Sequence, residues 1–73
     1  MTDRYMSDRE TRRFKSLMIA KGFDSVSGLA RAMGIRRETL SRKINGLEDW
    51  SRAEMEAVAR LFGEDPQTVF FSE

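Results

Sequence analysis

Two short helical patterns separated by a glycine occupy the middle of the chain, and they constrain its fold more than any other feature. Over 26–33, apolar residues recur at the i, i+3, i+4, i+7 spacing that lines one face of an α-helix. Over 37–45, only Leu40 and Ile44 form such a stripe, and the rest is polar. Gly34 ends the first pattern, as glycine commonly does at a helix C-terminus. The sequence therefore predicts a helix, a tight turn and a second helix with a polar outer side.

Capping signals place three further helices. Ser7 with Glu10, and Ser51 with Glu54, have the spacing of a capping box, in which each residue of the pair satisfies a backbone N–H of the other. Pro66 follows an aspartate, which indicates a helix start with proline in the first turn. No segment shows the strict alternation of a strand. We therefore expect one all-α domain over 1–73, with five short helices at about 8–21, 26–33, 37–45, 52–62 and 66–71.

Composition excludes several function classes. The chain has 73 residues with no cysteine and no histidine, so we expect neither disulfides nor a metal site. No base–nucleophile pair, glycine-rich phosphate loop or acidic cluster with metal spacing is present, so we expect no enzyme, no cofactor and no small-molecule ligand. No apolar run approaches the roughly 20 residues that span a bilayer, and residues 1–4 lack a signal-peptide profile. We expect a cytoplasmic protein without a membrane partner.

Charge is unevenly distributed along the chain. The formal net charge is only +1, but residues 31–47 carry five basic groups and one acidic group. Residues 48–73 carry two basic and seven acidic groups. This pattern predicts a polarised molecule with one side suited to a polyanion.

The basic segment includes the outer side of the helix predicted over 37–45. Arg36 and Arg37 lie at its N-terminal end, where the helix dipole disfavours cations by about 0.3–1 kcal/mol. Arg36 also occupies the capping position, where a serine or aspartate would be worth roughly 1 kcal/mol. One interpretation is that these residues form a solvated face. However, residues that lower local stability often belong to a functional site, and this favours contact with DNA. Projecting opposite the apolar stripe are Glu38, Ser41, Arg42 and Asn45.

The central segments and the chain around them resemble the helix-turn-helix domain of the phage repressor and Cro class, the XRE-like regulators. The resemblance rests on Leu29-Ala30-x-x-Met33-Gly34-Ile35, on Thr39-Leu40-Ser41-Arg42-Lys43-Ile44-Asn45-Gly46, on the helix over 51–62 and on Val69-Phe70-Phe71. It covers about 8–71. It implies a five-helix, lambda-repressor-like fold that places the helix over 37–45 in the major groove of duplex DNA.

The resemblance also implies which side chains touch DNA. We expect base contacts from Arg37, Glu38, Ser41 and Arg42, and phosphate contacts from Arg36, Lys43, Asn45 and Arg52. The two arginines suit guanine, and Glu38 suits the amino group of cytosine. An intrahelical ion pair with Arg42 at i+4 is an equally weighted role for Glu38.

Several positions depart from the family pattern. Val26 stands where the family often has a glutamine that binds phosphate, and the preceding turn has one extra residue around Asp24. Glu48 and Asp49 follow the Asn-Gly turn, where lysine or arginine is usual. Val26 argues against the contact that the glutamine makes. Glu48 and Asp49 argue against a phosphate contact by the loop, although Arg52 just beyond it could restore one.

The remaining aromatic and basic residues receive structural interpretations. Trp50 precedes the helix at 52–62 at a hydrophobic-staple position with Met55, which favours packing over stacking on DNA bases. At the C-terminus we expect Val69 and Phe70 to point inward and Phe71 to lie partly at a dimer surface. A solvated face is expected for the basic residues of the first helix, Arg9, Arg12, Arg13 and Lys15.

Together these features predict a sequence-specific DNA-binding transcription regulator, a Cro-like phage or prophage repressor in a bacterial or phage-infected cell. By the resemblance it acts as a homodimer on a palindromic operator. The alternative is a small helical protein–protein interaction module, antitoxin-like or an adaptor, that uses its acidic C-terminal half.

Overall fold

The computed structural model describes residues 5–71, and within this range the chain is helical with no β-strand. Helix α1 spans Asp8–Ala20, α2 spans Val26–Met33, α3 spans Arg37–Ile44 and α4 spans Arg52–Phe62. A π-helical turn, η1, spans Gln67–Phe71. The predicted all-α, five-helix architecture is therefore confirmed, and each α-helix lies within one residue of its expected bounds. The ends of the expected domain, 1–4 and 72–73, lie outside the described residues.

Both predicted capping boxes are present. The Ser7 hydroxyl accepts a hydrogen bond from the backbone N–H of Glu10 (3.2 Å), and the Glu10 carboxylate accepts one from that of Ser7 (2.9 Å). Ser51 and Glu54 repeat this reciprocal pair at the start of α4 (3.1 and 2.9 Å). Ser25 caps α2 through its side chain. These short-range bonds explain why three helix starts could be located from the sequence.

Two glycines adopt the left-handed conformation at turns that border α3. Gly34 (φ 74°) ends α2, and Gly46 (φ 79°) follows the last turn of α3. A β-carbon on Gly46 would also overlap the backbone carbonyl of Met6, whose side chain is buried. The chain before α1 therefore packs closely on the turn after α3.

The core gathers around an aromatic cluster. Trp50 is fully buried, with its ring centroid 4.9 Å from that of Phe70 and 5.6 Å from that of Phe14. Its indole N–H donates to the carbonyl of Lys43 at 3.2 Å. Met55 is also buried. Trp50 is thus a packing residue, as the staple position predicted, and it holds the end of α3 against the rest of the core.

The C-terminal turn differs from the expected α-helix in its winding and begins one residue later. Val69 and Phe70 are buried, as predicted, while Phe71 is 46% exposed. The Arg13 guanidinium donates to the carbonyl oxygens of Thr68 (2.9 Å) and Val69 (3.2 Å). The expectation that Arg13 belongs to a solvated face is therefore wrong, because this side chain ties α1 to η1.

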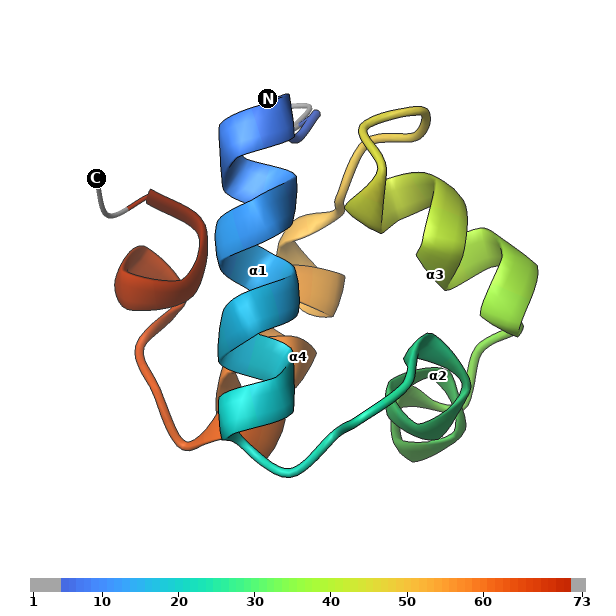
Figure 1. Ribbon diagram of the computed structural model, residues 1–73, viewed down its shortest axis with the longest axis vertical. Coiled ribbons are helices and arrows are strands. Elements are labelled where there is room, and N and C mark those ends of the chain that lie inside the picture. The colour runs from blue at the N-terminus through green and yellow to red at the C-terminus, as the bar shows by residue number, and fades with distance from the viewer. Residues whose placement is uncertain (1–4, 72–73) are drawn as a thin grey trace.

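The arrangement of the helices leaves α3 at one edge of the molecule (Figure 1). In this view α1 stands in the centre, η1 lies on one side of it, and α2 and α3 lie on the other. Helix α2 packs against both α3 and α4. Over residues 5–71, none of the helices has the length and apolar character that crossing a bilayer requires.

Candidate nucleic-acid interface

Helices α2 and α3 pack against each other on either side of the turn at Gly34. The backbone N–H of Ile35 donates to the carbonyl of Ala30 at 3.0 Å, which closes the end of α2. Leu40 and Ile44 on the inner side of α3 are fully buried. Burying both apolar residues of α3 leaves its opposite side to solvent, and the predicted helix-turn-helix geometry is present.

The first turn of α3 is open and basic. Arg36 stands at the capping position in extended conformation (φ −74°, ψ 143°) and makes no side-chain capping bond. Arg36, Arg37 and Glu38 are all exposed. Within residues 5–71, no hydrogen bond or ion pair engages these three side chains. Two guanidinium groups and one carboxylate are thus available to an external partner at this helix end.

Arg42 is half exposed and has an intramolecular partner. Its Nε donates to Oε1 of Glu48 at 3.0 Å, and its side chain is 52% exposed. The i+4 ion pair with Glu38, one of the two roles considered for that residue, does not form among the described residues. Glu38 therefore remains open to solvent on the outer side of α3.

Ser41 and Asn45 lie next to Arg42 on the outer side and interact with each other. The Asn45 side-chain N–H donates to the carbonyl of Ser41 at 2.9 Å, with a longer contact of 3.4 Å to the Ser41 hydroxyl. The Ser41 hydroxyl accepts in this contact, so its own proton remains available, as does the side-chain oxygen of Asn45, which only accepts.

Lys43 departs from its expected role. It is 5% exposed, and its Nζ lies 2.9 Å from the carbonyl of Asp49 and 3.0 Å from Oε1 of Glu54. Oε2 of Glu48 lies 3.4 Å away. The expectation that Lys43 contacts phosphate is corrected here, because its ammonium group is enclosed between the loop after α3 and the first turn of α4.

The ionisation of this cluster reflects the mutual contacts. Burial opposes the charge on Lys43, but the hydrogen bond and charge of Glu54, with Glu48, outweigh it and raise the pKa of Lys43. The hydrogen bond from Arg42 lowers the pKa of Glu48. Burial opposes the charge on Glu54, yet bonds from Ser51 and Lys43 lower its pKa overall. All three groups are charged at neutral pH.

These directions predict how stability depends on pH. A carboxylate with a lowered folded pKa contributes stability above its ordinary value of 4.5, and this is lost as the pH falls through the folded value. Lys43 contributes below its ordinary 10.5, and this is lost as the pH rises through the raised value. We therefore expect the free energy of unfolding, measured with urea, to fall both at acidic pH, where the two carboxylates lose their charge, and at alkaline pH, where Lys43 loses its charge. The alkaline decline should shrink in Lys43→Met, and an unchanged alkaline limb would contradict the ion pairing.

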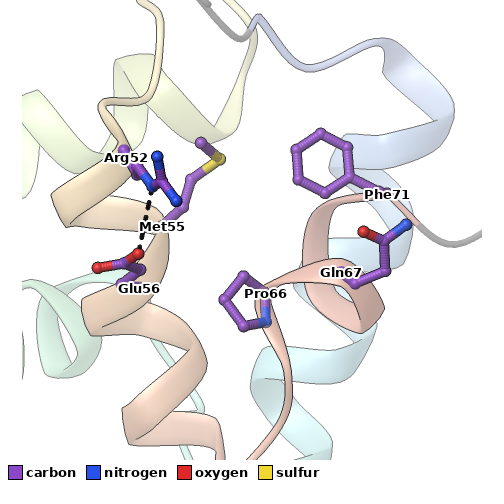
Figure 2. A pocket seen from close by; sticks show the side chains of 6 residues that line it. All are labelled: Arg52, Met55, Glu56, Pro66, Gln67 and Phe71. Carbon is purple, nitrogen blue, oxygen red and sulfur yellow. Dashed lines mark hydrogen bonds and ion pairs between the residues drawn. The ribbon is translucent and has the colours of Figure 1, made fainter.

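Arg52 lies at the start of α4, close in sequence to this cluster. It is 89% exposed, and its Nε makes a 3.4 Å contact with Glu56 at i+4. Arg52, Met55 and Glu56 of α4 border a hollow of about 330 Å³, with Pro66, Gln67 and Phe71 on its opposite side (Figure 2). Arg52 is thus free to reach an external anion, and Phe71 lines a concave surface.

Helical spacing in the sequence predicts most of this surface, but not the ion pairs that Glu48 makes with Arg42 and Lys43. The resemblance marks the acidic residues after α3 only as departures from the family pattern. In the structure the Glu48 carboxylate pairs with Arg42 and Lys43, whereas Asp49 accepts from Lys43 only through its backbone carbonyl. The excess of acidic groups over 48–73 indicates that some carboxylates pair with cations of the basic segment, but it does not say which cation each carboxylate meets.

Comparison with known proteins gives one family. The sequence pattern of the Cro/C1-type HTH DNA-binding domain matches residues 13–70, from the middle of α1 to the end of the core in η1. The matched region contains α2, α3 and Arg52, and it ends one residue before Phe71. No match was found among curated proteins or among solved structures.

Proposed function

Because the chain belongs to the Cro/C1-type family of helix-turn-helix DNA-binding domains, we propose that it reads a specific duplex sequence with α3 in the major groove. The observation that carries this proposal is the open first turn of α3, where Arg36, Arg37 and Glu38 are exposed and unpaired within residues 5–71. A cationic helix end without a capping bond gains most from a polyanion.

The exposed side chains of α3 divide by their chemistry. Arg37 and Arg42 can each offer two donors to guanine, and Glu38 can accept from the amino group of cytosine. Ser41 lies between them and can contact a base edge. Arg36, Asn45 and Arg52 carry donors toward the periphery, and we assign them to phosphate oxygens. Lys43 no longer belongs to this set.

As a regulator, we propose a Cro-like phage or prophage repressor that binds a palindromic operator as a homodimer. Phe71 supports the dimer assignment, since it is 46% exposed at the rim of the hollow between α4 and η1. Met55 and Pro66 line the same hollow, so Phe71 belongs to a partly apolar surface that a second copy of the chain could cover. The competing adaptor function is weakened, because two carboxylates of the acidic half, Glu48 and Glu54, are engaged with Lys43.

Selection of bound fragments from random duplex DNA tests this function. We expect one preferred site, with two-fold symmetry if the bound form is a homodimer. In titrations of that site, log K should fall by roughly 0.9 per neutralised phosphate for each unit of log salt concentration. Recovery of no duplex, or an affinity indifferent to salt, would contradict DNA binding and favour the adaptor function.

A further inference from the structure

Arg42 lies at the end of a chain of ion pairs that leads from the outer side of α3 into the first turn of α4. Its Nε donates to Oε1 of Glu48 at 3.0 Å, and Oε2 of Glu48 lies 3.4 Å from Nζ of Lys43. Nζ of Lys43 lies 3.0 Å from Glu54, which also accepts the backbone N–H of Ser51. Glu48 therefore contacts the buried ammonium group of Lys43 with one carboxylate oxygen and the exposed guanidinium group of Arg42 with the other.

The contact with Glu48 uses only one part of the Arg42 side chain. Within residues 5–71, the two terminal guanidinium nitrogens of Arg42 have no partner. These two nitrogens are donors that can meet the O6 and N7 acceptors of guanine together. An arginine fixed at Nε presents them with fewer rotamers to lose on binding than a freely rotating side chain does.

We propose that Glu48 is a positioning residue for DNA recognition, which orients Arg42 so that its terminal nitrogens face a base. This inference rests on the proposed function and deepens it. A carboxylate near DNA repels phosphate, so on affinity alone Glu48 is unfavourable. Its charge is locally balanced, because two cations (Arg42 and Lys43) and two carboxylates (Glu48 and Glu54) form the chain. The gain from Glu48 is therefore selectivity for the base that Arg42 meets.

Two substitutions at Glu48 separate its charge from its orienting bond. Glu48→Ala and Glu48→Gln remove the same negative charge, but the glutamine oxygen can still accept the Nε hydrogen bond. Both should bind unrelated DNA more tightly than the wild type. Discrimination among the four bases at the Arg42 position should fall about threefold to tenfold in Glu48→Ala and recover in part in Glu48→Gln. That position is the base pair at which Arg42→Ala loses its preference.

A double-mutant cycle and a matched control complete the test. In the Arg42→Ala background, Glu48→Ala should cause no further loss of discrimination, since the group that it orients is gone. Glu64→Ala removes a carboxylate that pairs with Lys21 at 2.6 Å beyond the end of α4, and it should leave discrimination unchanged. Thermal unfolding of each variant verifies that the domain is folded.

Three results would overturn the inference. Suppose that the wild type has a preferred site. If Glu48→Ala discriminates among the bases as well as the wild type, or if Glu48→Ala causes the same loss of discrimination in the Arg42→Ala background, Glu48 does not position Arg42. The proposed function then stands. If the wild type selects no duplex, the proposed function and this inference fall together.

In the free protein, the ¹⁵N resonance of Arg42 Nε should shift in Glu48→Ala and not in Glu64→Ala.

Discussion

Replacing Lys43 with alanine is expected to lower the free energy of unfolding by about 1–3 kcal/mol. The substitution removes the ammonium donor from the carbonyl of Asp49 and from the carboxylate of Glu54, which both lie 3.0 Å or less from Nζ. Glu54 then keeps its bond from the backbone N–H of Ser51. Breaking a fully buried ion pair costs about 3–5 kcal/mol. Glu54 is 27% exposed, so water recovers part of this loss.

Urea unfolding monitored by circular dichroism measures this effect as a lower midpoint at constant slope. Lys43→Met retains the length of the buried stem and should lose less stability than the alanine variant, because packing is preserved. Lys15→Ala, at an exposed position on α1, provides the control and should change stability by less than about 0.5 kcal/mol. A Lys43→Ala protein that unfolds like the wild type but binds all duplexes more weakly would instead restore Lys43 to the phosphate contacts.

The helix boundaries could be predicted because their causes are local. Ser7 and Ser51 bond to groups three residues away, and Gly34 ends α2 by adopting a conformation that glycine favours. The open N-terminus of α3 was predictable for the same reason, since Arg36 offers no capping oxygen. Features that depend on neighbours in the sequence can thus be derived without knowledge of the tertiary packing.

The roles of Lys43 and Arg13 depend instead on distant segments. A helical wheel places Lys43 on a flank of α3, where it can face either solvent or the core, and the loop to α4 decides between them. Arg13 meets carbonyl groups more than fifty residues away, in a π-helical turn that apolar spacing did not distinguish from an α-helix. Periodicity gives the side on which a residue lies, but not the partner that it meets there.

The acidic residues after α3 show how a departure from a family pattern can be compensated. By the resemblance, family members usually carry a cation where Glu48 stands, so we expect no phosphate contact from this loop. The same carboxylate contacts Arg42 and Lys43 and ties the loop to α3, while Lys43 in turn reaches Glu54 in the first turn of α4. Under the proposed function, a carboxylate in this loop lowers attraction for DNA but holds Arg42 at Nε, which agrees with the selectivity proposed for Glu48.

Replacing Arg37 with alanine is expected to weaken binding to the preferred duplex by about 1–3 kcal/mol, roughly fivefold to 150-fold. Arg37 is exposed and has no intramolecular partner within residues 5–71, so the substitution breaks no contact of the described fold. It also removes a cation from the positive end of the α3 dipole. Stability should therefore stay equal or rise, by about 0.3–1 kcal/mol at low ionic strength. Titration of the selected site and thermal unfolding of the same protein measure the two effects.

The opposite signs of these effects separate recognition from folding. A loss of affinity through misfolding would lower both quantities together, whereas a lost base contact lowers affinity alone and relaxes the preference at one base pair. Arg60→Ala is the matched control, because it removes an exposed arginine from the last turn of α4, where the helix dipole favours a cation. It should bind the site nearly as the wild type does and be slightly less stable. If Arg37→Ala and Arg60→Ala bind the selected duplex equally well, α3 does not enter the groove by its N-terminal end, and the basic first turn is a solvated surface.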